Sequence, residues 1–186
     1  MTSDTPGARG DGDGETDGSD PLQVRTRSRW VVRAAELVGL VLFVCVVGYV
    51  TTHPEELPTS QTIVTASTPV GRPVYLGVFQ AGGDFDRTLE VSGIKVFAVS
   101  SVPVTITPHL CVGGSVGVTS DPEPFCSELV GTEGATMTAG DEVVLEVSGD
   151  QPGVVTIERI QVAYRDRLQW DTQFAGSPAV VTILGS

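Results

Sequence analysis

Two cysteines in the second half of the chain are spaced for a disulfide bond. Cys111 and Cys126 lie fifteen residues apart, with glycines, prolines and an aspartate between them. In an exported domain such a pair forms a disulfide by default, and closing a loop of this length stabilises a fold by about 3 kcal/mol. A metal site would need more ligands, and the chain has only two histidines. The spacing therefore predicts a Cys111–Cys126 disulfide, and we expect no cofactor.

The carboxylates suggest one alternative chemistry. Asp84 and Asp86 lie on a glycine-flanked segment (GGDFDR) where they could share a Ca²⁺ ion with backbone carbonyls. A polar turn between strands explains the same residues, so calcium is kept as the alternative. The neighbouring acids Asp141 and Glu142 have the appearance of ordinary turn residues.

The segment 113–117 (GGSVG) matches the G-x-S-x-G pattern of a hydrolase nucleophile. That pattern requires a strand-to-helix turn, and here Asp121 and Pro122 follow too soon for a helix. No other arrangement in the sequence supports catalysis. We therefore expect a protein that is not an enzyme.

A basic and aromatic cluster is the candidate binding face; its members are Tyr164, Arg165, Arg167 and Trp170. Aromatic and arginine side chains supply much of the binding energy of protein interfaces. The alternating pattern of residues 154–164 points Tyr164 inward, and an extended strand would carry Asp166 inward as well. Burying an unpaired carboxylate is costly. We therefore expect the chain to turn at Asp166 and to expose both arginines beside Trp170; a purely structural role for the aromatic residues is the alternative.

An apolar run follows a cluster of arginines in the first third of the chain. The run Leu37–Val50 is uninterrupted, and residues 34–52 contain only Glu36 as a charge. Nineteen helical residues span about 28 Å, close to the thickness of a bilayer core. The run lacks a small-residue cleavage site, which favours an uncleaved signal anchor. The arginines precede the run, so the amino terminus is predicted to be cytoplasmic and the carboxyl terminus extracytoplasmic, in the plasma membrane; they are Arg25, Arg27, Arg29 and Arg33.

Composition limits the partners. The 186 residues are 40% hydrophobic and carry a formal net charge of −12. Because so acidic a chain leaves no basic surface that could neutralise the many phosphates of a polyanion, nucleic acid is not expected as a partner. The first twenty residues are rich in Gly and Asp and carry no aliphatic residue that could build a core, which predicts a disordered tail.

The remaining sequence predicts an all-β domain. Short runs rich in β-branched residues recur about every eight to twelve residues between Gly, Pro and Asp, and such strands need a second layer to bury one face. We expect a β-sandwich, immunoglobulin-like in the broad sense. The predicted organisation is an acidic cytoplasmic tail (1–24), an arginine-rich juxtamembrane segment (25–33), a transmembrane helix (34–52), a Pro/Thr/Ser stalk (53–72) and the β-sandwich (73–186).

The function expected from these features is non-catalytic. The chain is predicted to be a single-pass membrane protein whose extracytoplasmic β-sandwich serves as an interaction or accessory module of a membrane or envelope complex. Its expected partners are the lipid bilayer and a protein in the membrane or envelope. The alternative is a module that binds a ligand, either a carbohydrate or calcium.

Overall fold

The computed structural model describes residues 29–52 and 54–185. Helix α1 (Arg29–Thr52) is 24 residues long. Its segment Trp30–Tyr49 has a mean hydropathy of 2.3 and buries no part of its surface within the protein. The helix is thus long and apolar enough to cross a membrane, and a signal sequence would have the same properties. The predicted disordered tail lies outside the described residues.

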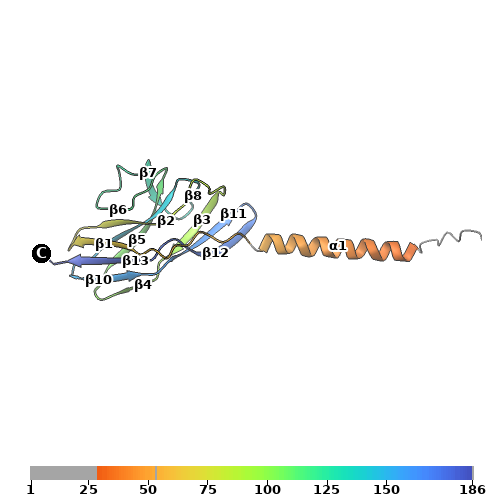
Figure 1. The fold of residues 1–186 in the computed structure, drawn as a ribbon, viewed down its shortest axis with the longest axis horizontal. Helices are drawn as coiled ribbons and strands as arrows, with labels where there is room; N and C mark the ends of the chain where they lie inside the picture. The colour runs from red at the N-terminus through yellow and green to blue at the C-terminus, as the bar shows by residue number, and fades with distance from the viewer. Residues whose placement is uncertain (1–28, 53, 186) are drawn as a thin grey trace, which may run out of the picture. The chain divides into compact units, whose positions relative to one another are not determined.

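The rest of the described chain is mostly β, as the sequence predicts (Figure 1). Residues with β-branched side chains dominate these strands, which suits the pleated backbone. The strands are β1 (Val64–Pro69), β2 (Val74–Gln80), β3 (Leu89–Lys95), β4 (Ala98–Ser100), β5 (Thr105–Val112), β6 (Val118–Thr119), β7 (Glu128–Gly131), β8 (Thr136–Met137), β9 (Glu142–Ser148), β10 (Gly153–Ile157), β11 (Ile160–Asp166), β12 (Gln169–Ala175) and β13 (Ala179–Leu184).

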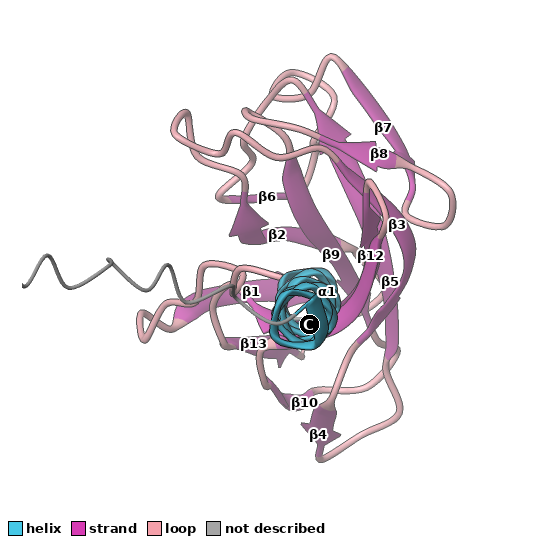
Figure 2. Ribbon diagram, turned by 90° about the vertical axis from the view of Figure 1, so that its right-hand side faces the viewer, coloured by secondary structure: helices cyan, strands magenta, loops and turns pink. Residues whose placement is uncertain are grey.

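These strands form three sheets, with the orders β1-β13-β10-β4, β12-β11-β3-β8 and β6-β2-β9-β5-β7. Strands β1 and β13 are parallel, and the other paired strands are antiparallel. Figure 2 shows strands β10, β13 and β4 at one side of the β domain and β7 and β8 at the other. The pairing of β11 with β3 shifts register between Ala163 and Tyr164, which is the mark of a bulge.

One hydrophobic cluster joins all three sheets. Its fully buried members include Leu76 of β2, Val91 of β3, Val155 of β10, Ile160 of β11 and Val181 of β13. Strand β11 alternates as predicted, because Ile160, Val162 and Tyr164 are buried. Burial of this apolar surface is the main favourable contribution to folding.

The residues after the helix lie against the β domain. The Leu57 side chain is 3% exposed, and its backbone N–H donates to Gln173 Oε1 at 2.7 Å. Thr59 forms a parallel bridge with Gly176, and strand β1 follows at Val64. The β structure therefore begins within the range predicted to be a stalk.

The Cys111–Cys126 disulfide is confirmed, with the two Cα atoms 5.2 Å apart. The loops it joins approach closely, because a Cβ at Gly114 would lie 1.9 Å from the carbonyl oxygen of Phe125. Glycine is needed there because any side chain would collide with backbone.

Asp141 and Glu142 do more than cap a turn. Both are nearly fully buried. Asp141 accepts the N–H groups of Gly113 and Thr138, at 2.8 and 2.7 Å, and Glu142 accepts the N–H of Val116. These two carboxylates therefore hold the loop 113–117, which the sequence pattern had marked as a hydrolase motif.

The Glu142 carboxylate lies next to Gly77, and its hydrogen-bond partners among the described residues are groups of the loop 113–117. A Cβ at Gly77 would lie 2.2 Å from Glu142 Oε1, so the absence of a side chain at Gly77 makes room for the carboxylate. Burial raises the pKa of Glu142, although hydrogen bonds from Val116, Ser115 and Gly117 oppose the shift.

Candidate functional site

The predicted binding face lies on the hairpin formed by β11 and β12. Asp166 pairs with Gln169 across the hairpin, so Arg167 and Leu168 are its two loop residues; we call these two residues the hairpin tip. Arg167 has a φ of 55°, which two-residue hairpin loops require and which glycine adopts most easily. The turn therefore comes one residue later than predicted, and strand β11 continues through Asp166.

Asp166 points inward because a cation meets it there. Arg87 Nε donates to Asp166 Oδ2 at 2.9 Å, and the two side chains are only 12% and 16% exposed. Arg87 Nη2 also donates to the hydroxyl oxygen of Tyr164 at 3.2 Å, with the guanidinium 5.4 Å from the centre of that ring. The carboxylate that sequence reasoning expected to force a turn is thus paired, which removes most of the cost of burying it.

Burial and the hydrogen bonds of Arg87 together shift the pKa values of Tyr164 and Arg87. Burial raises the pKa of Tyr164, and the hydrogen bond from Arg87 opposes that shift. For Arg87, burial by itself would lower the pKa, but the hydrogen bonds to Tyr164 and Asp166 outweigh it and raise the pKa. Arg87 is therefore charged whenever the domain is folded.

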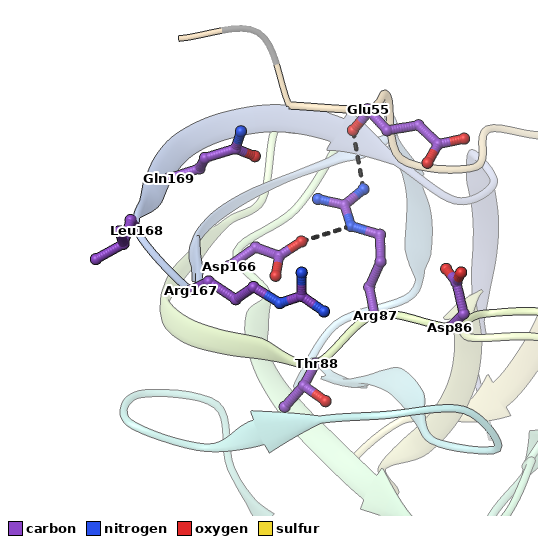
Figure 3. Close-up of a pocket in the computed structure, with 8 residues that line it drawn as sticks. All are labelled: Glu55, Asp86, Arg87, Thr88, Asp166, Arg167, Leu168 and Gln169. Carbon is purple, nitrogen blue, oxygen red and sulfur yellow. Dashed lines mark hydrogen bonds and ion pairs between the residues drawn. The ribbon is translucent and has the colours of Figure 1, made fainter. Parts of the chain in front are cut away.

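Arg87 also fixes the chain that follows the helix. Its Nη1 donates to the carbonyl oxygen of Glu55 at 2.9 Å. Figure 3 shows the guanidinium between Glu55 on one side and Asp166 on the other. These three residues line a cavity of about 460 Å³. The hairpin tip lines the same cavity, while the Leu168 side chain points away from it.

The outer side of the hairpin carries exposed aromatic residues. Trp170, Thr172 and Phe174 alternate with less exposed residues along β12, so they share one face. Trp170 is 67% exposed and Phe174 is 51% exposed. Beside Trp170 and Thr172, Ala163 of β11 and Ser92 of β3 help to line a shallow hollow.

Two cations lie over rings on this side. The Arg165 guanidinium is 5.3 Å from the centre of the Trp170 ring, and the Lys95 ammonium is 4.7 Å from that of Phe97. The Phe97 and Phe174 rings are 6.1 Å apart. We call this surface the aromatic face; its members are Lys95, Phe97, Arg165, Trp170 and Phe174.

The four predicted residues therefore separate into two groups. Arg165 and Trp170 belong to the aromatic face, and Arg167 lies at the hairpin tip. Tyr164 is 1% exposed and belongs to the core, so it takes no part in a surface. Its inward direction followed from the alternation of β11, whereas its inclusion in a face followed only from its neighbours in sequence.

Sequence reasoning missed Phe97, Phe174 and Arg87. Phe174 has a usable signal, since it lies four residues after Trp170 in a strand and must share its face. Phe97 and Arg87 come from segments far away in the chain, and their sequence carries no sign of the contact.

The calcium alternative rests on two exposed carboxylates. Asp84 and Asp86 both lie in the exposed turn between β2 and β3. Among the residues that the structure describes, no group of three or more His, Cys, Asp or Glu side chains is placed to hold a metal ion. Two carboxylates fall short of the six to eight oxygen ligands that Ca²⁺ takes.

Comparison of the chain with known protein families, curated proteins and solved structures finds no match.

Proposed function

We propose that this chain is a single-pass plasma-membrane protein whose extracytoplasmic β-sandwich binds a protein partner without catalysing a reaction. In this proposal α1 is an uncleaved signal anchor with its amino terminus in the cytoplasm. The length and hydropathy of Trp30–Tyr49 support the anchor. The disulfide supports an oxidising compartment for the β domain.

The arrangement of the core supports the sandwich. One cluster contains buried side chains from all three sheets, as expected for sheets that pack face to face, immunoglobulin-like in the broad sense.

The observation that carries the binding function is the aromatic face. Trp170 and Phe174 are exposed on one face of the sheet, Phe97 beside them is half-buried, and cations lie over Trp170 and Phe97; aromatic and arginine residues are enriched in protein interfaces. Solvent-exposed Trp170 and Phe174 gain little for the fold, whereas covering them would release water from apolar surface. Lys95 and Arg165 favour a partner whose apolar surface is flanked by carboxylates.

A carbohydrate ligand is the second candidate. It is favoured by the hollow beside Trp170, whose lining includes Ser92 and Thr172 as residues with hydrogen-bonding side chains. An aromatic ring beside polar side chains is the arrangement that sugar rings use.

Topology is tested with a reporter fused after Ser186 and with protease added to spheroplasts. We expect reporter activity outside the cell and digestion of the β domain. Protection of the β domain from protease would contradict the orientation. Neutralising the four arginines that precede the apolar run should give a mixed orientation.

Binding is tested by comparing three forms of the full chain purified in mild detergent: the unchanged chain, Trp170→Ser with Phe174→Ser, and Phe125→Ser as the control. Phe125 is 50% exposed, which matches Phe174. We expect the same co-purifying protein with the first and third forms and its loss with the second. Equal recovery with all three forms would contradict a role for the aromatic face.

A further inference from the structure

We propose that the hairpin tip inserts into the headgroup layer of the membrane that anchors the chain. This inference rests on the proposed function, because it requires α1 to span the bilayer. It adds a second contact with lipid, made by Arg167 and Leu168 of the β domain.

The first step is the position of Glu55. Its carbonyl oxygen is held by Arg87, and it lines the cavity together with both residues of the hairpin tip. The helix ends at Thr52, three residues earlier. Because a chain extends by at most about 3.6 Å per residue, Glu55 can lie no more than about 11 Å from the end of the helix. An anchor that ends at the membrane surface therefore keeps Glu55, and the hairpin tip beside it, close to that surface.

The second step is the chemistry of the tip. Leu168 is 81% exposed, the largest exposure among the exposed large hydrophobic residues that the structure describes, and its side chain points away from the cavity (Figure 3). An aliphatic side chain held in water gains free energy when it enters the apolar boundary of a bilayer. Trp170, two residues further on, is of the type enriched at membrane interfaces.

The third step is charge. Asp166, the acid between Arg165 and Arg167, is paired with Arg87, and the other carboxylates that line the same cavity are those of Glu55 and Asp86. Arg165 and Arg167 are the cations on either side of it, and Arg165 Nη1 also lies 3.6 Å from Glu90 Oε2 at a half-exposed site. Basic residues beside an exposed apolar residue favour anionic headgroups.

The backbone conformation of Arg167 at the hairpin tip is a further observation that supports the proposal. A residue other than glycine seldom adopts a φ near 55°, and this chain places an arginine there. Strain of this kind is found where a side chain serves a function. The Arg167 side chain turns back over the cavity beside Asp166 (Figure 3), so the Leu168 side chain is the one that points outward at the tip.

The test uses the full chain in vesicles of phosphatidylcholine and phosphatidylglycerol that contain a lipid with a nitroxide on its headgroup. The chain has two tryptophans, so Trp30→Phe with Trp170→Phe removes the native signal. Leu168→Trp then places a single fluorophore at the tip. The matched control is Val154→Trp in the same background: Val154 is 45% exposed, and β10 begins at the end of the β domain away from the β11–β12 hairpin (Figure 1).

We expect the nitroxide to quench Leu168→Trp at least about twofold more than Val154→Trp, since interfacial side chains enter the headgroup region. Adding Arg167→Gln should reduce that difference in anionic vesicles. If the protein floats with the vesicles and the two fluorophores are quenched equally, the lipid contact is refuted and the anchor stands; a protein docking site at the tip would give this result. If the protein does not float with the vesicles, the membrane anchor itself is refuted.

Discussion

Two phenylalanines of the β domain are equally exposed but have different surroundings. Phe174 is 51% exposed and packs near Phe97, on the face that also carries Trp170. Phe125 is 50% exposed and lies in the disulfide-bonded loop beside Asp121 and Glu123. Single exposed hydrophobic residues are common on soluble proteins, whereas grouped ones mark interaction surfaces. The comparison therefore supports the proposal that the hairpin region, and not the loop region, is the binding surface.

The two regions also treat their inward carboxylates differently. Asp166 in the hairpin meets the guanidinium of Arg87. Glu142 below the loop meets backbone N–H groups, and its burial raises its pKa. The hairpin is thus held by a charge pair, and the loop is held by a disulfide and a carboxylate that resists ionisation.

The largest effect is expected from breaking the charge pair. Arg87→Met leaves Asp166 without its cation and the Glu55 carbonyl without its donor. Removing one partner of a buried pair costs about 4 kcal/mol, so the melting temperature of the full chain in mild detergent should fall by about 12–15 °C.

The matched variant Arg87→Met with Asp166→Leu removes both charges. It should recover most of the lost stability, because the unpaired carboxylate is gone. Similar melting temperatures for the single and double variants would show that the pair does not hold the hairpin.

The disulfide should have the next largest effect. Cys111→Ser with Cys126→Ser opens a loop of fifteen residues, which lowers stability by about 3 kcal/mol and the melting temperature by about 10 °C. Cys45→Ser, in the helix, is the control and should leave the melting temperature unchanged. Free thiols at both Cys111 and Cys126 in the native exported protein would contradict the linkage.

The smallest effect on stability is expected from the buried glutamate. The pKa of Glu142 in the folded chain is raised above its usual 4.5. At lower pH the side chain is therefore protonated in both the folded and the unfolded chain, and its burial then costs no ionisation free energy. As the pH rises above 4.5, the unfolded chain releases its proton first, so stability falls until the pH passes the folded-state pKa.

Melting curves recorded between pH 5 and 8 test this sign. The slope of stability against pH should be less negative in Glu142→Gln than in the unchanged chain. Identical slopes would contradict the raised pKa, because they would mean that Glu142 has the same pKa in the folded and the unfolded chain.

Part of this comparison follows from the sequence, and part of it depends on contacts between distant segments. The spacing of two cysteines predicts the disulfide, and alternation predicts the inward side of β11. The Arg87–Asp166 pair joins residues 79 positions apart, and a lone arginine after a polar turn does not reveal its partner. The same limit applies to Phe97, which reaches Phe174 only through the pairing of β3, β11 and β12.

The turn residues show a second limit. Asp141 and Glu142 have the composition of a surface turn, yet they are buried because loop 113–117 supplies N–H donors and Gly77 leaves room for a carboxylate. Residue type alone does not distinguish a solvated acid from one that is satisfied inside the fold.

The most direct test of the central claim is photo-crosslinking in native membranes. A benzoylphenylalanine placed at Phe174 or at Phe125 compares the two regions at equal exposure with the same probe. The aromatic face predicts a discrete crosslinked protein from position 174 that disappears when Trp170→Ser is added, and no such product from position 125. A product from position 125 alone would contradict the assignment and place the binding surface on the disulfide-bonded loop.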